Sequence, residues 1–529
     1  MAFAPTGSLF SAQSMRIQEI LNKNIEVFLP ALDPAWRDTT VSSQGVGSAS
    51  LIGRDMKVIK TYMGSMAGVL EMADSRNNFV LYGDNTVGNI ADKLQTQGLN
   101  NTWPDATEGP MARPYQLGIG MKAMVSNLLV TLGEMQAEAT PAFIGEILAP
   151  KLEGHARLIA HTLCNYWYIS DNTYFQLGYN SGGVTVTQTV ASGNVPQFST
   201  LSFSPTDLNT DRFAVGMRVD VYTSASFVAG SRANETGGTR QNAFVTRVDE
   251  VRNIVTIQVM NVLLTTTTTG TYYFCYANNI TAPGGTVRGN GIAGINSWIK
   301  GGDSSGSTFT VANTLLGNDA DGDATKQINV NSHPEFKSYV KGSVGTLTEH
   351  KLRQYLRGYH RAKEKYGQYI DCLIASDGVW LNYESQKIGQ YMLDRTNRLS
   401  SVTNEGSQEG FKFTFDGRTY SGYTSNYIEA GTVYGLRKGG TNWKKYVPPS
   451  PKGTQKFDKA EAFIPFEFIA PALGYSTIKV PITKAATGSG NSLLTEGAQM
   501  PGMLRMQLVP DQPSGIKLTG VSYDKLYGD

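Results

Sequence analysis

Residues 347–376 read LTEHKLRQYLRGYHRAKEKYGQYIDCLIAS, and this stretch decides the fold class of the chain. Its first part carries an apolar stripe at helical spacing, formed by Leu352, Leu356, Tyr359 and Tyr366. Gly367 follows directly, and glycine often ends a helix because it adopts positive φ angles without strain. The stretch therefore predicts an amphipathic helix that stops at Gly367.

The residues on either side of this helix predict how it starts and which elements come after it. Thr346 and Glu349 have the spacing of a capping box, in which each side chain accepts a hydrogen bond from the backbone N–H of the other. The short apolar run from Ile370 to Ala375 indicates a buried strand. Ser376 is positioned to cap a further helix that continues to about residue 392.

The chain beyond this second helix is dominated by strand patterns. Residues 411–420 predict a hairpin, because the pair Asp416-Gly417 suits a type I′ turn. Residues 466–529 are strand-like, punctuated by proline, and carry no long helical pattern. An order of helix, strand, helix and then several strands predicts an α+β fold.

The N-terminal part of the chain has a different character. One short amphipathic helix is predicted before residue 30, with the apolar positions Ile17, Ile20, Leu21, Val27 and Phe28. A Ser- and Gly-rich run follows over 42–50, so we expect an arm that becomes ordered only on another surface. Turn signals between short apolar runs over 75–120 predict a long hairpin or extended loop.

The longest helical pattern begins at Thr140, a good N-cap followed by Pro141 at the first helical position. Apolar residues recur at helical spacing from there to about Asp171. Pro150 has no N–H for the preceding turn, and its ring crowds the carbonyl of Glu146. We therefore expect a bend in this helix at Pro150.

Residues 172–290 change abruptly to Thr, Val, Gly, Asn and Ser. Alternation of apolar and polar residues begins at Val184, at Met217 and at Ile254. This pattern, broken by turns, predicts a small all-β barrel or sandwich. The threonine run over 265–269 is expected to be a solvent-facing strand or loop without a function of its own.

Composition limits the class of protein. The chain has 529 residues, 40% of them hydrophobic and 17% charged, with a formal net charge of +2. These values indicate a globular protein of several domains and show no strongly basic nucleic-acid-binding domain. The three cysteines, Cys164, Cys275 and Cys372, are expected to be buried and unpaired in a reducing cytosol. No secretion signal or membrane-spanning run is visible, so we expect a soluble protein.

Catalytic and metal-binding signatures are not found in the sequence. The chain lacks Gly-x-Ser-x-Gly, His-Glu-x-x-His and the Walker phosphate loop. Residues 318–323 resemble a calcium loop, but Ala324 stands in the sixth place and Val330 in the twelfth. His155, His161 and Cys164 are spaced so that they do not gather on one helix face. We therefore predict no catalytic residue, no metal and no cofactor, and a protein that is not an enzyme.

Several phrases of the sequence resemble the coat proteins of tailed bacteriophages that have the Hong Kong 97 capsid fold. They are Ser332-His-Pro-Glu-Phe-Lys-Ser-Tyr, Leu347-Thr-Glu-His-Lys-Leu, Ile370-Asp-Cys-Leu-Ile-Ala-Ser, Phe415-Asp-Gly-Arg-Thr-Tyr and Tyr427-Ile-Glu-Ala-Gly-Thr-Val-Tyr-Gly-Leu. The last two are similar to the family's late axial-domain strands. The phrases cover about 332–440, and the order of segments resembles the family over most of 1–171 and 290–480.

The resemblance implies a division of the chain into seven segments. They are an N-terminal arm (1–70), an extended loop (71–130), a peripheral domain with a spine helix (131–171), a β-rich insertion domain (172–290), a peripheral-domain connector (291–345), an axial domain (346–465) and C-terminal peripheral-domain strands (466–529). The β-rich segment departs from the family's common core, although members of the family do carry insertion domains.

The function implied by the resemblance is that of a major capsid protein. Such a chain self-assembles into hexamers and pentamers of an icosahedral head, assembled in the host cytoplasm and found in the virion. Its partners would be further copies, scaffolding, portal and cement proteins, and packaged double-stranded DNA bound non-specifically, with no membrane. The predicted helix over 347–366 carries Lys351, Arg353, Arg357, Arg361, Lys363 and Lys365. The first four are the candidate inner-surface or inter-subunit basic face; the alternative is a solvated helix face balanced by Glu349 and Glu364.

Three other functions remain open at this point. A β-rich surface adhesin or tail-associated receptor-binding protein would explain 172–290, but not the two long helical stretches around it. An enzyme with a β-barrel insert would explain the size, yet it offers no catalytic constellation. A cellular encapsulating-shell protein shares the capsid fold, but such chains are usually shorter and lack this insert.

Overall fold

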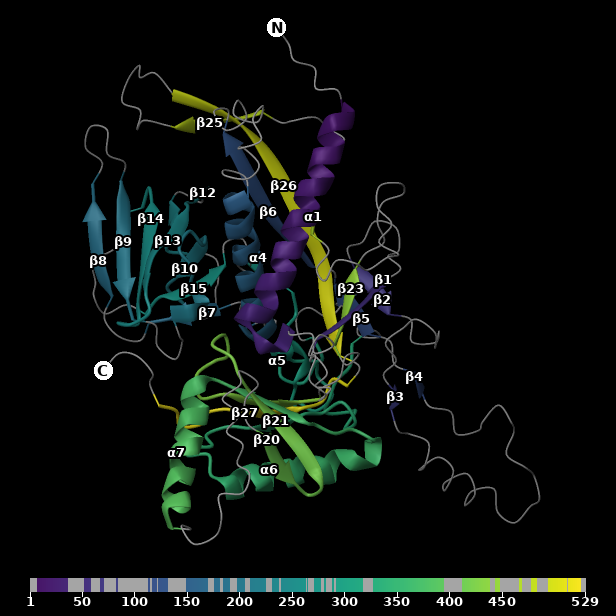
Figure 1. Cartoon of the computed structure of the whole chain (residues 1–529). Helices are drawn as coiled ribbons and strands as arrows, with labels where there is room; N and C mark the ends of the chain where they lie inside the picture. The colour runs from purple at the N-terminus through teal and green to yellow at the C-terminus, as the bar shows by residue number, and fades with distance from the viewer. Residues whose placement is uncertain are drawn as a thin grey trace, which may run out of the picture.

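The computed structural model combines helices and strands along the chain, so the protein is of the α+β class (Figure 1). It describes residues 7–36, 52–58, 67–70, 82–83, 113–114, 117–120, 122–131, 149–169, 176–180, 184–190, 197–204, 210–224, 231–236, 239–262, 264, 271–276, 280–281, 288–289, 292–316, 327–393, 412–437, 443–447, 466–468, 477–482, 493–510 and 512–524. Within these ranges, no helix combines the length and the apolar character that a membrane span requires.

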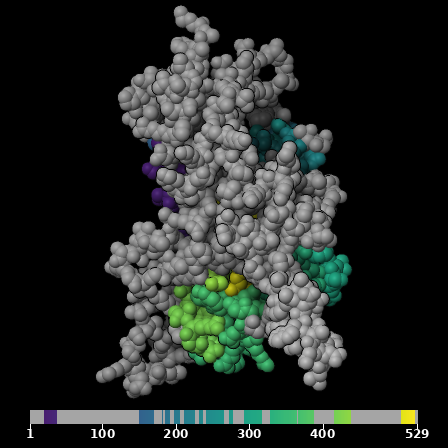
Figure 2. All heavy atoms as spheres, turned by 90° about the vertical axis from the view of Figure 1, so that its right-hand side faces the viewer, coloured from purple at the N-terminus to yellow at the C-terminus, as the bar shows by residue number. Residues whose placement is uncertain are grey.

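Six strands drawn from residues 339–518 form one sheet in the lower part of Figure 1. Their order is β18 (Tyr339–Lys341), β27 (Ile516–Leu518), β22 (Val433–Leu436), β19 (Cys372–Ala375), β21 (Arg418–Thr424) and β20 (Lys412–Phe415). The helices α6 (Glu349–Lys363) and α7 (Asp377–Leu393) pack beside it, and the 3-10 helix η9 (Glu364–Tyr366) extends α6. We call these strands and helices the α+β unit; much of the lower end of Figure 2 is its surface, in green.

Strand β19 in the middle of the α+β unit is buried on both faces. Cys372 and Ile374 belong to one hydrophobic cluster, whereas Leu373 and Ala375 belong to another. Because successive side chains of a strand point to opposite faces, the sheet separates two cores. The α6 and α7 side chains close the second core. Burial on both faces explains why β19 is an unbroken apolar run, as predicted.

The start of α6 differs from the predicted capping box. The helix begins at Glu349, and the Thr348 hydroxyl accepts a hydrogen bond from the Lys351 N–H at 3.3 Å. The cap is therefore Thr348 and not Thr346, because Glu349 is the first helical residue and not the third. The predicted end is confirmed, since Gly367 follows η9 with a φ of 67°.

The predicted side-chain cap of α7 is wrong. The Ser376 backbone carbonyl accepts from the Val379 and Trp380 N–H groups, at 3.1 and 3.3 Å. The Ser376 hydroxyl is buried instead, and it has no hydrogen-bond partner among the described residues. Asp377 supplies negative charge in the first turn of α7, where it is favourable to the helix dipole.

The hairpin between β20 and β21 is confirmed. Phe415 pairs with Arg418 across a two-residue turn. Asp416 and Gly417 both have positive φ, 54° and 72°, which is the geometry of a type I′ turn.

Helices α1 (Gly7–Leu32) and α4 (Ala149–Ile169) pack along one another above the α+β unit (Figure 1). The described part of α4 begins at Ala149, so Pro150 is its second residue. The bend predicted at Pro150 depends on a helical turn before it and therefore stays a prediction. The residues over 140–148 lie outside the described residues.

Helix α1 is much longer than the short helix predicted from its apolar residues. Its buried positions include Leu21, Ile25 and Leu29, which are four residues apart and share one face. Val27 was expected on that face but is 66% exposed. It lies two residues from both Ile25 and Leu29, which places it on the opposite side of the helix.

The described elements between residues 176 and 289 are mainly strands, and we call this segment the β-rich block. One sheet has the order β10 (Val219–Tyr222), β15 (Tyr273–Tyr276) and β7 (Gln176–Tyr179), and the other β13 (Ala243–Asp249), β14 (Ile254–Met260), β9 (Phe198–Phe203) and β8 (Thr185–Thr189). Two short hairpins join β11 (Glu235–Thr236) to β12 (Thr239–Arg240) and β16 (Ile280–Thr281) to β17 (Arg288–Gly289). The predicted alternation is present in β14, whereas all four residues of β10 are buried. The threonine run over 265–269 lies outside the described residues.

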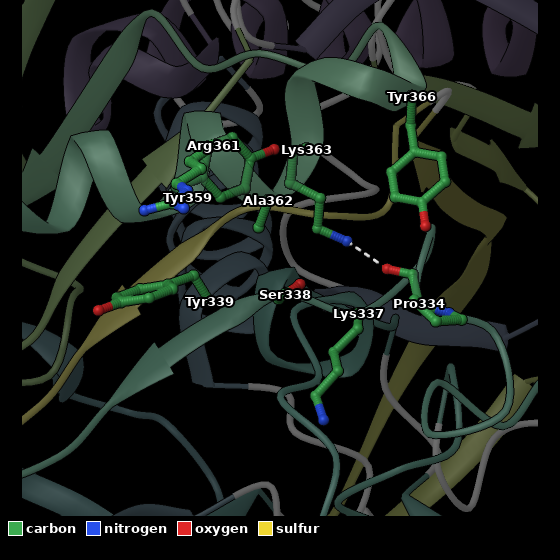
Figure 3. A pocket seen from close by; sticks show the side chains of 9 residues that line it. All are labelled: Pro334, Lys337, Ser338, Tyr339, Tyr359, Arg361, Ala362, Lys363 and Tyr366. Atoms are coloured by element: carbon green, nitrogen blue, oxygen red, sulfur yellow. Dashed lines mark hydrogen bonds between the residues drawn. The ribbon is translucent and has the colours of Figure 1, made fainter.

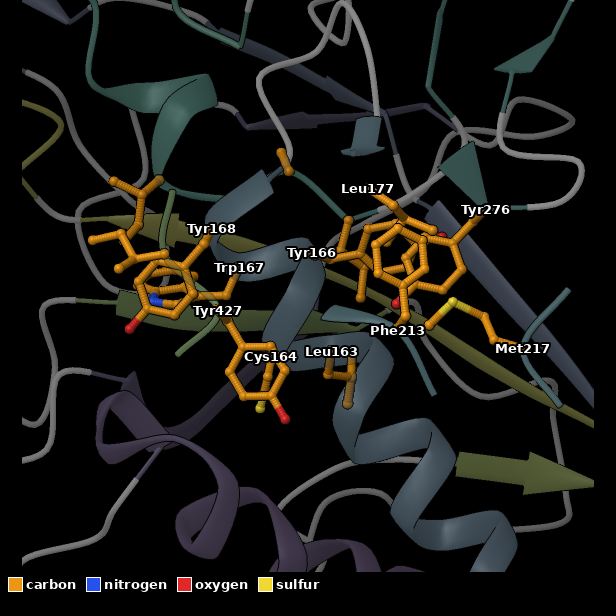
Figure 4. Packing of buried hydrophobic residues seen from close by; sticks show 14 of the residues in the cluster. Leu163, Cys164, Tyr166, Trp167, Tyr168, Leu177, Phe213, Met217, Tyr276 and Tyr427 are labelled. Atoms are coloured by element: carbon orange, nitrogen blue, oxygen red, sulfur yellow. The ribbon is translucent and has the colours of Figure 1, made fainter. Parts of the chain in front are cut away.

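The β-rich block and α4 share one hydrophobic core, shown in Figure 4. The rings of Tyr166 and Tyr276 lie 5.1 Å apart, and the Asn165 amide donates to the Tyr276 hydroxyl at 2.7 Å. On the β-rich side, Phe213 and Leu177 pack into the same cluster. The block is therefore packed directly against the helix.

One 18-residue strand, β26 (Leu493–Pro510), connects distant parts of the chain. It pairs antiparallel with β6 (Lys122–Thr131), β23 (Trp443–Val447), β24 (Phe466–Phe468) and β25 (Thr477–Ile482), and β1 (Ile52–Val58) pairs with β23. Two further antiparallel pairs, β2 (Ala67–Leu70) with β5 (Leu117–Gly120) and β3 (Tyr82–Gly83) with β4 (Arg113–Pro114), have the nesting of the predicted long hairpin.

Candidate functional site

The four predicted basic residues all lie on α6, and three of them form one exposed row. Arg353, Arg357 and Arg361 are exposed and follow one another at four-residue intervals. Residues at this spacing are neighbours on a helix surface. We call these three residues the arginine stripe. The opposite side of α6 is buried in the second core through Leu352, Leu356 and Tyr359.

Lys351 does not belong to this stripe. Its ammonium group donates to the backbone carbonyls of Val344 and Thr346, at 2.9 and 3.0 Å. These bonds fix the loop that enters α6, so Lys351 has a structural role. The sequence pattern identified the charge but not the two carbonyl acceptors.

Arg353 is partly neutralised by its own helix. It forms an ion pair with Glu349, one turn earlier, and the two side chains are 48% and 37% exposed. A pair this exposed contributes little to stability because water and salt screen it. The guanidinium also lies over the Phe415 ring, 5.4 Å from its centre. The predicted balancing role of Glu349 therefore applies to Arg353 alone.

Arg357 and Arg361 differ from Arg353 in their surroundings. The Arg357 guanidinium lies 5.4 Å from the centre of the Phe415 ring, which is a cation–π contact. Neither arginine forms an ion pair within the part of the chain that the structure describes. An exposed arginine with free donors is suited to bind a carboxylate or a phosphate in a two-pronged manner.

Glu364, the second predicted balancing residue, belongs to a polar cluster between α6 and the β20–β21 hairpin. It pairs with Arg418 at 3.2 Å, and another Arg418 nitrogen donates to the Nδ1 atom of His360 at 2.9 Å. Because Nδ1 accepts this bond, the imidazole proton is on Nε2, which donates to the Tyr420 hydroxyl at 2.6 Å. Burial and the Arg418 charge lower the pKa of His360, so the neutral form is the one built into the fold.

An open pocket of about 420 Å³ lies at the C-terminal end of α6. Its lining residues are Pro334, Lys337, Ser338, Tyr339, Tyr359, Arg361, Ala362, Lys363 and Tyr366 (Figure 3). Lys363 is buried and donates to the carbonyls of Pro334 and Glu335, at 2.6 and 3.2 Å. These hydrogen bonds hold the segment before β18 against the helix. The pocket lies where these two elements meet.

His161 and Cys164 of α4 are buried. His161 Nε2 lies 2.7 Å from the Asp211 carbonyl oxygen, to which it donates, and burial lowers the pKa of His161. Burial also raises the pKa of Cys164, so the thiol stays protonated and unreactive. All three cysteines are buried, and none of them forms a disulfide. Among the described residues no three metal-binding side chains gather, and the calcium-like run over 318–323 lies outside them.

Two buried charges that the sequence did not reveal join distant parts of the molecule. Asp33 is fully buried at the end of α1 and accepts hydrogen bonds from the Tyr168 hydroxyl at 3.2 Å and the Ser425 hydroxyl at 3.0 Å. Arg212 donates to the Tyr427 carbonyl at 2.9 Å, and burial lowers its pKa to about 10. These bonds connect α1, α4, the β-rich block and the α+β unit, between residues up to 392 positions apart.

Comparison with known proteins finds matches among solved structures alone. No protein-family model and no curated protein sequence matches the chain. The chain is similar to the capsid asymmetric unit of cyanophage A-1(L), with 11% identity, 92% of this chain and 96% of that chain covered, and a TM-score of 0.35. A structure of Mycobacterium phage Patience matches with 10% identity, 80% and 79% covered, and a TM-score of 0.27. The SrpI encapsulin complex from Synechococcus elongatus PCC 7942 matches with 12% identity, 35% and 55% covered, and a TM-score of 0.19.

Proposed function

We propose that this chain is the major capsid protein of a tailed bacteriophage, with the Hong Kong 97 fold. In this role it self-assembles into the hexamers and pentamers of an icosahedral head around double-stranded DNA. One observation carries the proposal. The sequence phrases that resemble this family, spread over about 332–440, come together in or beside a single structural unit.

Each phrase falls on a defined element of the α+β unit. The phrase from Ser332 leads into β18, and the phrase from Leu347 opens α6. The phrase from Ile370 contains β19 and ends at Ser376, directly before α7. The phrase from Phe415 makes the type I′ turn, and the phrase from Tyr427 ends in β22. Together the phrases contribute residues to five of the six strands of the sheet and to the first turn of α6.

In the proposed capsid architecture, the α+β unit lies within the axial domain, which we assign to 346–465. Helix α4 is the spine helix of the peripheral domain, β26 belongs to the C-terminal peripheral-domain strands, and the β2–β5 and β3–β4 pairs lie in the extended loop. The β-rich block is the insertion domain. Because its core is continuous with that of α4, we place its attachment on the spine helix.

A coat subunit needs large contacts with its neighbours. Burying apolar surface contributes roughly 25 cal/mol per Å² and must offset the entropy of ordering arms and loops. One chain that makes the same head-to-tail contact repeatedly closes into rings. Further proposed partners are scaffolding, portal and cement proteins, and packaged DNA held non-specifically. The proposed location is the virion after assembly in the host cytoplasm.

The test is negative-stain electron microscopy of the purified full-length chain, paired with size-exclusion chromatography over a range of protein and salt concentrations. We expect closed shells, rings or tubes. A monomer or a trimer under every condition would contradict the proposal and favour a β-rich adhesin. The variant Leu356→Asp serves as the control, because it disrupts the second core and should abolish assembly through misfolding.

A further inference from the structure

Two exposed helix faces of the α+β unit carry opposite charge. The arginine stripe on α6 runs from Arg353 to Arg361. With a rise of 1.5 Å per residue, the ends of this stripe are about 12 Å apart along the helix. The Phe415 ring lies against Arg353 and Arg357, so an apolar group adjoins the charged groups of the stripe.

Helix α7 presents the complementary pattern. Asp377 and Glu384 are exposed, and their spacing of two helical turns places them on one face, about 10 Å apart. Leu381 lies between them on the same face and is 47% exposed. A third carboxylate, that of Asp524, is held at the margin of this face by the Asn382 amide at 3.0 Å. We call Asp377, Leu381 and Glu384 the α7 face.

We propose that the arginine stripe of one copy binds the α7 face of a neighbouring copy. This inference rests on the proposed function, because it names a contact through which the coat subunits would associate. The two charge patterns are opposite in sign and similar in length. The half-buried Phe415 ring beside the arginines offers the exposed Leu381 an apolar contact, which a phosphate backbone does not.

The two faces lie on different edges of the same unit, since α7 stands at its left and α6 runs along its base in Figure 1. A contact between two different patches of identical chains is head-to-tail, and each copy keeps its second patch available for a further copy. Repetition therefore produces a ring when the rotation closes. Arg357 and Arg361 would gain carboxylate partners that they lack within the described part of their own chain.

The test reverses charge on one face at a time. The α6 variant carries Arg357→Glu and Arg361→Glu, and the α7 variant carries Asp377→Lys and Glu384→Lys. Alone, each variant brings like charges together, so we expect about tenfold less assembled protein than for the parent. The control matched to the α6 variant carries Arg247→Glu and Arg252→Glu on the β-rich block. It makes the same change in net charge as the α6 variant and should assemble like the parent.

Equal parts of the two variants give the decisive result. In the mixture, the reversed α6 face of one variant meets the reversed α7 face of the other, and the two unreversed faces also meet. Alternating rings with an even number of subunits should therefore recover, while rings of five should not. A chain that carries all four substitutions should recover both. Circular dichroism melting of each variant identifies any loss caused by unfolding.

The outcomes separate the two proposals. If the parent assembles and the single-face variants assemble equally well, the contact is wrong and the capsid function stands. If folded single-face variants fail and neither the mixture nor the fourfold variant recovers, the pairing of these two faces is also wrong. A parent chain that never assembles overturns both proposals.

Discussion

The β-rich block and the helix-covered face of the α+β unit differ in how their cores relate to the rest of the chain. The interior of the β-rich block is continuous with α4, α1 and one face of β19. The core under α6 and α7 is separate and lies entirely within the α+β unit. A destabilising substitution in the core of the β-rich block should therefore affect distant parts of the molecule. A destabilising substitution in the core under α6 and α7 should affect the α+β unit alone.

The largest effect is expected from Leu356→Asp, which places a charge in the second core. Leu356 is fully buried, so the free energy of unfolding should fall by about 4 kcal/mol or more. Urea denaturation measures this loss, and hydrogen exchange locates it. Protection should be lost in α6 and β19 and kept in β13 and β14. The volume-conserving control Leu356→Met should cost less than about 1.5 kcal/mol.

Asp220→Ala should have the next largest effect and should spread further. Asp220 is buried and accepts from Arg240 at 2.6 Å and from Asn234 at 3.1 Å. Its loss leaves a guanidinium without its carboxylate, which costs about 3 kcal/mol. Because the core is shared, hydrogen exchange in α4 should accelerate as well. The control Asp249→Ala removes a more exposed pair and should cost about 1 kcal/mol at most. Unchanged exchange in α4 would show that the shared core does not transmit the disturbance.

Tyr276→Phe tests the connection between the β-rich block and α4 by removing a single oxygen atom. The change removes the hydroxyl that joins the β-rich block to Asn165 on α4. A buried hydrogen bond of this kind contributes about 1 kcal/mol, and the Asn165 amide keeps its bond to the Arg212 carbonyl. A double-mutant cycle with Asn165→Ala isolates the coupling in thermal unfolding. Additive effects would mean that this bond does not connect the two elements.

Thr348→Ala tests the cap of α6 and should act locally. Loss of the hydroxyl that accepts from Lys351 should cost about 1 kcal/mol. Thr346→Ala is the matched control, since its side chain does not cap the helix, and it should cost only a few tenths. The two variants are compared by urea denaturation. An equal loss for both would restore the predicted capping box.

The smallest expected effect is a pH dependence in the α+β unit. The folded-state pKa of His360 lies below its ordinary value of 6.5, because burial and Arg418 disfavour the imidazolium. Above about 6.5 the imidazole is neutral in both states, and its contribution to stability is complete. As the pH falls below 6.5, the unfolded chain binds the proton first, and stability declines toward the folded-state pKa.

Urea titrations at pH 8 and pH 5.5 measure this decline, and His360→Gln should reduce it. The comparison with the variant is needed because Asp211 acts in the opposite direction. Burial raises the pKa of Asp211 to about 6, so its uptake of a proton favours the folded state as the pH falls. An unchanged pH dependence in His360→Gln would exclude the imidazole as its source.

Local signals in the sequence predicted much of the α+β unit. The stripe Leu352, Leu356 and Tyr359 and the pair Asp416-Gly417 each act over a few residues, and the structure places them as expected. The cap of α6 was misplaced because Thr346 and Thr348 both precede Glu349, and spacing alone favoured the wrong one. Exposure of the arginine stripe followed from the helical period, but the carbonyl partners of Lys351 did not.

The hydrogen bonds between distant regions could not be predicted from the sequence, for a physical reason. Asp33 bonds to Ser425 and Asn165 bonds to Tyr276 across 392 and 111 positions of sequence. Asp33 carries no pattern that distinguishes a buried carboxylate from one at a helix end in solvent. Such contacts depend on the complete tertiary arrangement, which a short window of sequence does not contain.

The long strand β26 has a consequence for the order of events during synthesis. Strand β6 pairs with it through Lys122 and Met506, and β1 pairs with β23, which in turn pairs with β26. While the ribosome is still translating the middle of the chain, β6 has no partner, and its polar backbone stays hydrated. The hairpin β20–β21 can close at once. Pairing within such local hairpins can therefore precede the pairing of β1 and β6, which waits for the C-terminal strands and has the slow pace of distant strand pairing.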